Sequence, residues 1–434
     1  MGKLFCYRFF LHFTSVAALA AVVLWGCPEG RETPKSSETI RIGVLYPLSG
    51  EDAVSGEDLK AGVELAVEMV NNRFDLPLPL AKEPGLSGKS GRKIELVIRD
   101  TKADPVTAAK SVEELVKKER VVAVMGCWHS RVTAMASEQA EILHVPFLNG
   151  ESCCPHLIQR GLKWFFQTTP DDSLFSDEMF NFINEIRKSH PAASTCPVAL
   201  VYENGMWGTG VAQAHKRMAC LYHYPIAADI PYNENDDDFN SEIEKLTAAM
   251  PAFVLHASYT RDSLVFIKAY QNLPVKPLSV IGMNAGFISP QFIPELGEDA
   301  EGIFSREVWA VDWTDKNATA KAVDSLFLSR NHHHMTGGSA RAFTALMVLG
   351  EAIDRAKTLE PKEIRKALSE TELRPEEIIM PWEGIRFDPE TGKNVLGKGI
   401  IVQVQNGRYT TVWPKPLAAR PPIWPDSNGC SLEK

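Results

Sequence analysis

Apolar and polar positions alternate along the chain with two periods, one typical of strands and one typical of helices. Ile40 to Tyr46 is a β-branched run ended by Pro47-Leu48-Ser49-Gly50, which predicts a strand and a turn. Residues 56–71 follow with apolar side chains at helical spacing. The same change of period then recurs, and it predicts strands at 94–99, 121–126 and 146–149 and helices at 105–119 and 132–143.

A second series of the same kind begins near Asp171. It predicts helices at 174–189, 209–219, 238–249 and 261–273 and strands at 198–202, 226–229, 253–257 and 278–282. The remainder predicts a strand at 303–305, helices at 338–357 and 361–369, and an antiparallel finish at 385–388 and 400–405. Alternation of this kind predicts an α/β fold with mostly parallel sheets, helices on both faces and ligands at the carboxyl ends of the strands.

The first 27 residues have the pattern of a bacterial export signal: Lys3 and Arg8 precede an apolar run from Phe13 to Trp25. Leu24-Trp25-Gly26-Cys27 resembles a lipoprotein lipobox, which predicts cleavage before Cys27 and lipidation of that cysteine. The mature protein is then expected in the periplasm or at the outer cell surface, with residues 28–39 as a tether to a membrane. An uncleaved anchor helix and an ordinary signal with an incidental Cys27 are the alternatives.

Length and charge narrow the class of protein. A chain of 434 residues exceeds one ordinary core, so two domains are expected. The net charge is −9, and Lys and Arg are spread evenly, which argues against nucleic acid as a partner. After Leu24, no apolar run approaches the roughly 20 residues of a membrane span. These features indicate a globular chain, expected to be monomeric.

The cysteines and histidines predict no metal site and no cofactor. None of the eight cysteines shows the paired spacing of a zinc site, and His332-His333-His334 is expected in a solvated loop. Cys196 precedes one expected strand and Cys220 ends the following helix, so a disulfide between them is plausible in an oxidising compartment. Two buried free thiols are the alternative.

Four stretches carry a family resemblance: residues 40–50 (IRIGVLYPLSG), 145–172, 202–219 and 238–263. Their order and spacing resemble the periplasmic solute-binding proteins of ABC transporters of the leucine/isoleucine/valine-binding type. The resemblance implies the type I periplasmic binding protein fold, with two doubly wound Rossmann-like lobes, three crossings and a ligand held between the lobes. It places lobe I at 40–170 and 308–378 and lobe II at 171–307 and 379–413. The Pro-rich composition of 414–434 separately predicts a loosely ordered tail.

In lobe I, two loops that follow strands are expected to bind a ligand carboxylate. The loop 127–130 opens a helix, so its backbone N–H groups and the Ser130 hydroxyl are suitable donors. The loop 149–153 corresponds, by the resemblance, to the family's second carboxylate-binding segment. Ordinary helix capping by Ser130 and Ser152 is the alternative. The predicted contacts here are Trp128, His129, Ser130, Glu151, Ser152 and Cys153.

In lobe II, aromatic residues at strand ends are expected to close over the ligand. Tyr202 ends a strand that leads to Trp207, which matches a family aromatic, and Tyr259 follows the strand 253–257. Packing without ligand contact is the alternative. The branched-chain members place a glutamate for the ligand ammonium where this chain has Asn284. The ligand is then polar or neutral, or its ammonium is received by Glu151 or Glu203.

These observations predict the solute-binding component of an ABC importer. It is expected to capture a small polar ligand, above all an amino acid of the branched-chain or a related type, by closure of its two lobes, and to deliver it to the permease. A sensor for amides, urea or short peptides with the same fold is the runner-up. An enzyme is disfavoured, because no nucleophile and base stand in a suitable arrangement and no Gly-x-Ser-x-Gly motif is present.

Overall fold

The computed structural model describes residues 39–424 except 190–196, 235, 237 and 275. Cys27 and Cys196 therefore lie outside the described residues, and both the lipidation and the Cys196–Cys220 disulfide stay predictions. Cys220 itself is exposed. Within the described part of the chain, no helix combines the length and the apolar composition needed to cross a membrane.

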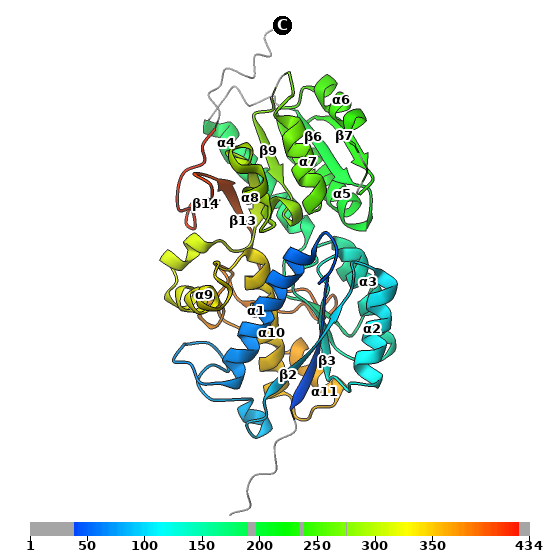
Figure 1. The fold of residues 1–434 in the computed structure, drawn as a ribbon, viewed down its shortest axis with the longest axis vertical. Coiled ribbons are helices and arrows are strands. Elements are labelled where there is room, and N and C mark those ends of the chain that lie inside the picture. Colours follow the sequence, from blue (N-terminus) through cyan, green and yellow to red (C-terminus); the bar gives the residue numbers. More distant parts are fainter. Residues whose placement is uncertain (1–38, 190–196, 235, 237, 275, 425–434) are drawn as a thin grey trace, which may run out of the picture. The chain divides into compact units, whose positions relative to one another are not determined.

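The first sheet is parallel and has five strands in the order β2-β1-β3-β4-β5. The strands are β1 (Ile40–Tyr46), β2 (Ile94–Asp100), β3 (Ala123–Gly126), β4 (Phe147–Asn149) and β5 (Phe165–Gln167). Helices α2 (Pro105–Lys117) and α3 (Ser130–Ile142) pack together on one face, and α1 (Ala53–Asn71) and α10 (Gly337–Arg355) on the other (Figure 1). The chain order reverses beside β1, where ligands of doubly wound sheets bind.

The second sheet has seven strands in the order β14-β13-β10-β9-β8-β6-β7. Strands β6 to β10 are parallel, while β13 and β14 are antiparallel. The predicted antiparallel finish is therefore right for 400–404, whereas residues 385–386 pair with 372–373 outside this sheet and the strand 409–413 was not predicted. The strands are β6 (Val198–Glu203), β7 (Ile226–Tyr232), β8 (Phe253–Ala257), β9 (Ser279–Gly282), β10 (Phe304–Glu307), β13 (Ile400–Val404) and β14 (Tyr409–Trp413). Without β13 and β14, the order repeats that of the first sheet.

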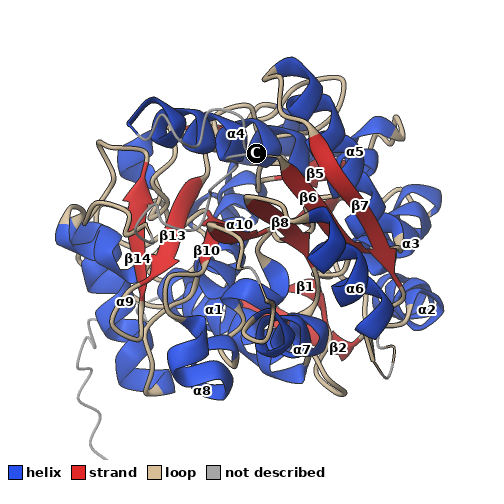
Figure 2. Cartoon of the chain, turned by 90° about the horizontal axis from the view of Figure 1, so that it is seen from above, coloured by secondary structure: helices blue, strands red, loops and turns tan. Residues whose placement is uncertain are grey.

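Helices cover both faces of the second sheet as well (Figure 2). They are α4 (Asp172–Ser189), α5 (Met206–Leu221), α6 (Asn240–Ala249), α7 (Thr260–Tyr270) and α8 (Phe292–Leu296). Beyond the sheets lie α9 (Ala318–Asn331), α11 (Pro361–Ser369) and a small antiparallel pair, β11 (Glu372–Leu373) with β12 (Ile385–Arg386). The predicted α/β class with two doubly wound sheets is confirmed.

Helix α10 is the most deeply buried helix next to the first sheet. It begins with a capping box at Thr336 and buries sixteen of its nineteen residues. Gly62 of α1 lets the two helices approach closely, because a Cβ there would lie 2.3 Å from the Ser339 carbonyl oxygen. The helix carries Arg341, which is 1% exposed, into the interior. A guanidinium at this depth requires polar partners, and the loops at the strand ends supply them.

Two expectations about the last third of the chain concern the order of the C-terminal tail and the position of the lobe boundaries. Residues 414–424 of the tail make specific contacts: the Gln403 side chain bonds both backbone groups of Ile423, and Trp424 stacks on Phe304 at 4.8 Å. The expectation of a loose tail is therefore wrong for residues 414–424. The lobe boundaries stay a prediction, although Lys393 bridges to Gln167 beside the first sheet. This contact lies within the range 379–413 that the resemblance assigns to lobe II.

Candidate functional site: a cavity between the two sheets

Loops at the carboxyl ends of both sheets enclose a small cavity, here called the central cavity. It measures ≈ 20 Å³, which is enough for about one water molecule. Residues after β3, β4, β6, β8 and β9 and one residue within β10 surround it. They are Trp128, Ser130, Glu151, Ser152, Cys153, Trp207, Tyr259, Asn284, Ala285 and Arg306.

Eight of the ten residues predicted from the sequence line this cavity, and His129 and Tyr202 do not. His129 is fully buried behind the wall, where its Nε2 lies 2.9 Å from the Asp52 carboxylate. The Tyr202 ring instead lies under the Lys216 ammonium at 5.8 Å. Arg306 and Ala285 line the cavity although the sequence analysis did not single them out. The available signal for Arg306 was a buried strand, Phe304–Glu307, that carries two adjacent charged residues.

The two serines of lobe I do not cap helices. Helix α3 begins at Ser130 with His129 as its N-cap, and the His129 side chain makes no capping hydrogen bond. The Ser152 hydroxyl donates to the Trp128 carbonyl at 2.8 Å and so joins the loops after β3 and β4. The Asn149 side chain fixes the second loop through the Ser152 backbone N–H at 2.9 Å. Ser130 is the first residue of α3 and lines the cavity, so the donors at this helix N-terminus lie beside it.

Three aromatic side chains from both sheets meet over the cavity. The Tyr259 ring lies 5.5 Å from Trp128 and 5.0 Å from Trp207, measured between ring centroids. The Trp207 indole N–H donates to Asp172 at 3.0 Å, which fixes the orientation of that ring. Such rings give a closing site large apolar contact with little loss of rotamer entropy.

Backbone strain concentrates at the same place. Trp128, Asn284 and Ala285 have φ angles of +85°, +66° and +45°, a region that residues with a side chain rarely adopt. All three line the central cavity. Strained conformations of this kind persist where the surrounding structure holds them and are frequent at ligand-binding sites.

Arg306 brings an incompletely paired positive charge to the cavity. Its Nη2 donates to Asp172 at 3.2 Å, and the guanidinium lies 3.9 Å from the centre of the Phe175 ring. The Nε and Nη1 atoms are buried and have no hydrogen-bond partner among the described residues. Burial raises the pKa of Asp172 to about 7, against the lowering effect of Arg306. A buried guanidinium with two free donors is suited to receive an anionic group.

Glu151 brings an incompletely paired carboxyl group to the same cavity. Its Oε1 accepts from the Tyr46 hydroxyl at 2.9 Å, while Oε2 is buried without a partner in the described part of the chain. Burial raises the pKa of Glu151 to about 7, because the charged form has lost its hydration. Glu203, the other candidate for the ligand ammonium, is already engaged: its oxygens accept from the backbone N–H groups of Gly205 and Gly208.

Asn284 is part of a polar chain that links both sheets. Its amide oxygen accepts from Arg341 at 3.3 Å, and its amide nitrogen donates to Glu307. Arg341 also donates to the Glu151 carbonyl at 3.3 Å. Further contacts across the interface join Asp52 to Thr260 at 3.4 Å and Arg131 to Glu234. These contacts hold the two sets of loops together around the cavity.

The profile of the family described as periplasmic binding protein matches residues 39–408. The chain belongs to this family. Membership places it outside the cytoplasm and among binding proteins. Leu/Ile/Val-binding protein homolog 7 of Brucella suis biovar 1 (strain 1330) is 24% identical over 388 residues, which cover 88% of this chain and 93% of the relative.

Solved structures share the fold. The branched-chain amino acid transporter substrate binding protein LivJ from Streptococcus pneumoniae, in complex with isoleucine, has a TM-score of 0.72 and 22% identity, covering 87% of this chain and 100% of that one. An ABC transporter solute binding protein from R. palustris, in complex with benzoate, has a TM-score of 0.71 and 18% identity, covering 91% and 100%. The two-lobed fold predicted from the resemblance is confirmed, while the ligand differs among such structures.

Proposed function

We propose that this periplasmic binding protein is the solute-binding component of an ABC importer and captures a zwitterionic amino acid in the central cavity. The observation that carries the proposal is the pair of unsatisfied side chains of opposite charge type in the cavity lining, one from each set of loops and strands: Nε and Nη1 of Arg306, and Oε2 of Glu151. A carboxylate beside Arg306 and Ser130 and an ammonium beside Glu151 would satisfy both. Trp128, Trp207 and Tyr259 would then cover the side chain of the ligand.

Closure of the lobes is the proposed mechanism. At ≈ 20 Å³ the cavity is far smaller than the roughly 300 Å³ or more of ordinary ligand pockets, so the lobes must separate to admit an amino acid. A ligand that touches Ser130 on one side and Trp207 on the other favours the closed arrangement by its differential affinity. The permease would recognise that arrangement. The likeness to the isoleucine complex from Streptococcus pneumoniae supports this proposal.

An aromatic carboxylate is a second candidate ligand. Arg306 and Ser130 serve a carboxylate whether or not an ammonium is present, and the three aromatic walls suit a ring. The structural neighbour from R. palustris is in complex with benzoate. With its pKa near 7, Glu151 can also be neutral beside such a ligand.

The test is native mass spectrometry of protein purified from cells, followed by thermal-shift and calorimetric titration with the amino acids and with benzoate. A folded-state ligand raises the apparent stability by mass action. Binding of an amino acid together with compaction in small-angle scattering supports the proposal. Binding of benzoate alone favours the second candidate. Binding of neither, or binding that leaves both Trp207→Ala and Ser130→Ala like wild type, contradicts a site in this cavity.

The anchor is a separate proposal. If Cys27 is lipidated, Cys27→Ala moves the mature protein from the membrane fraction into the soluble extract. Cys27→Ser serves as the matched variant, since it also removes the thiol. A wild-type protein that is already soluble after cell disruption contradicts lipidation.

A further inference from the structure

A larger pocket lies beside the central cavity, between the same two sets of elements. This side pocket measures ≈ 320 Å³ and is formed by residues 288–290, 293–294, 307, 309–311, 334–337, 402 and 407–409. It shares no lining residue with the central cavity. Its volume reaches the lower end of the roughly 300–1000 Å³ that small-molecule sites occupy. Size alone therefore allows it to hold a small organic molecule.

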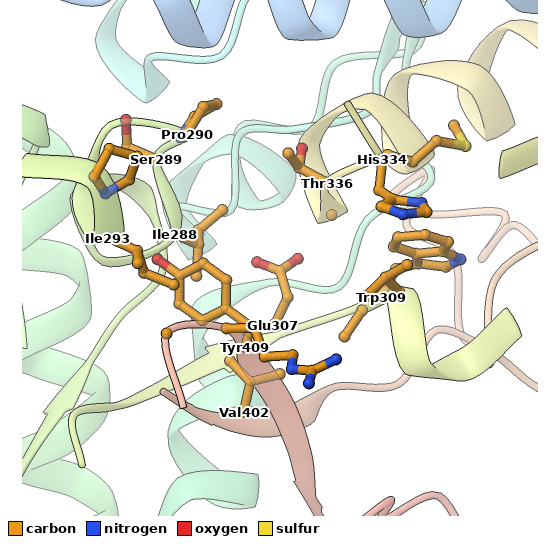
Figure 3. A pocket seen from close by; sticks show the side chains of 17 residues that line it. Ile288, Ser289, Pro290, Ile293, Glu307, Trp309, His334, Thr336, Val402 and Tyr409 are labelled. Atoms are coloured by element: carbon orange, nitrogen blue, oxygen red, sulfur yellow. The ribbon is translucent and has the colours of Figure 1, made fainter. Parts of the chain in front are cut away.

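Alternation along β10 separates the two sites. Arg306 and Glu307 are neighbours in this strand, so their side chains point to opposite faces. Arg306 lines the central cavity and Glu307 lines the side pocket. Figure 3 shows the Glu307 carboxylate directed into the space between the ring of Tyr409 and the indole of Trp309.

Glu307 is a buried carboxylate without an ion pair. It is 3% exposed, and its partners are the backbone N–H of Val308 at 3.0 Å and the amide of Asn284. Among the described residues, no Lys, Arg or His forms a salt bridge with it. Charged carboxylates at this depth are normally paired with a cation. Burial raises the pKa of Glu307, and the guanidinium groups of Arg341 and Arg306 offset this rise only in part.

Most of the remaining wall is apolar and aromatic, while Arg408, His334, Ser289 and Thr336 add polar groups to it. Ile288, Ile293 and Val402 supply aliphatic surface, and Trp309 and Tyr409 supply two aromatic faces. Aromatic faces attract cations electrostatically, and most strongly where water is excluded. The Tyr409 hydroxyl already donates to the Phe287 carbonyl at 2.7 Å, so it is engaged outside the pocket. The chemistry of the walls thus suits an apolar body with one cationic head.

Gly337 explains how the carboxylate reaches this position. A Cβ at Gly337, the first residue of α10, would lie 1.7 Å from the Glu307 Oε1 atom. The absence of a side chain there lets Glu307 lie against the N-terminus of the helix, whose dipole favours a negative charge. The Glu307 carboxylate is therefore held at the floor of the side pocket, whether or not a ligand is present.

We propose that the side pocket is a second ligand site that binds a small apolar amine, with its ammonium group on Glu307 and its apolar body against Trp309 and Tyr409. This site is separate from the proposed amino-acid site and does not depend on it. The residues that line it come from both sets of elements and from the segment that leads from one to the other.

Benzylamine is the probe, and benzyl alcohol is its neutral counterpart of nearly the same shape. Calorimetric titration of the full mature chain should show saturable binding of benzylamine, with benzyl alcohol at least tenfold weaker. Glu307→Gln keeps the shape of the side chain and should reduce benzylamine affinity to that of the alcohol. Ile293→Trp, at the partly exposed edge of the pocket, should abolish binding of both by filling the space.

Three results would overturn the proposal: no saturable binding of benzylamine to wild type, equal binding to Glu307→Gln and wild type, or unchanged binding to Ile293→Trp. Thermal melting of each variant checks that it is folded. If Glu307→Gln fails to fold, Ile293→Trp together with the comparison of amine and alcohol still decides the question. Trp207→Ala, in the central cavity, is the matched control and should bind benzylamine like wild type, so a failure here is distinct from a failure of the amino-acid site.

Discussion

The central cavity and the side pocket flank the same strand but differ in size and in charge. The cavity measures ≈ 20 Å³ and exposes unpaired atoms of Arg306 and Glu151, which have opposite charge. The side pocket measures ≈ 320 Å³ and contains one buried carboxylate, Glu307, in apolar surroundings. Volume by itself would favour the side pocket as the main site. The unsatisfied charges favour the central cavity, because an unpaired buried ion costs several kcal/mol and a volume change requires only lobe movement.

The largest effect is expected for Arg306→Gln. Removing one partner of a buried charge pair costs about 3 kcal/mol, or roughly a hundredfold in affinity for the amino-acid ligand. Benzylamine binding in the side pocket should change far less, since Arg306 lines the central cavity and not that pocket. Calorimetric titration measures both. Arg306→Lys is the control that keeps the charge, and an equal loss of both ligands would contradict the separation of the two sites.

Trp207→Ala should have the second largest effect, a loss of about 2 kcal/mol or roughly thirtyfold in affinity for the amino-acid ligand. The ring lies 5.0 Å from Tyr259 and forms part of the wall over the cavity. Trp207→Phe keeps the apolar contact and removes only the hydrogen bond to Asp172, so it should cost about 1 kcal/mol. Small-angle scattering should also show weaker ligand-induced compaction for the alanine variant. If Trp207→Ala compacts like wild type on ligand binding, Trp207 does not contribute to closure.

Glu151→Gln should lower amino-acid affinity about tenfold at pH 8 and less at pH 6. Below its pKa of about 7, the wild-type carboxyl is itself mostly protonated and has lost its attraction for an ammonium. The folded pKa lies above the ordinary value of 4.5, so protonation stabilises the fold below pH 7, and this stabilisation is lost as the pH rises through 7. The variant should therefore melt higher than wild type at pH 8, with a smaller difference at pH 5. If the affinities of wild type and Glu151→Gln change in parallel with pH, Glu151 is excluded as the ammonium partner.

Ser130→Ala should have the smallest effect, about 1 kcal/mol or roughly fivefold in affinity. The backbone N–H groups at the start of α3 remain as donors to the carboxylate. Ser130→Thr keeps the hydroxyl and serves as the control for its contribution. Titration with the amino acid and with benzylamine should show a loss for the first ligand only. A loss for neither would mean that Ser130 contributes no contact to the bound carboxylate.

The positions of most elements followed from local pattern. Residues 40–46, 253–257 and 361–369 form the predicted elements with the predicted bounds. Runs of β-branched residues and a Pro at the start of a helix carry their structural preference within a few neighbours. Short or weakly patterned elements escaped this reasoning. Helix α9 buries only four of its residues, and β5 has three residues whose strand state depends on pairing with Phe147 to Asn149.

The residues of the candidate site likewise include some that the sequence predicted correctly and some that it did not. A loop that directly follows a strand can be located from the sequence, because the carboxyl ends of parallel strands meet at one edge. Ser130, Glu151 and Trp207 follow strand ends in the sequence, were predicted as ligand contacts and line the central cavity. The same reasoning failed for Tyr202, since which face of a strand end is turned toward the ligand depends on the register of the neighbouring strands.

By itself, the sequence determined the α/β class, the family and most of the loops that surround the central cavity. Only the tertiary structure decided which charges meet there. Arg306 and Glu307 are adjacent in the sequence, yet the strand turns one toward the central cavity and the other toward the side pocket. Arg341 looks like an isolated charge in an apolar helix until burial forces it onto Asn284 and the Glu151 carbonyl. Long-range packing sets such pairings, because the interaction of buried charges depends on distances in space that no local pattern encodes.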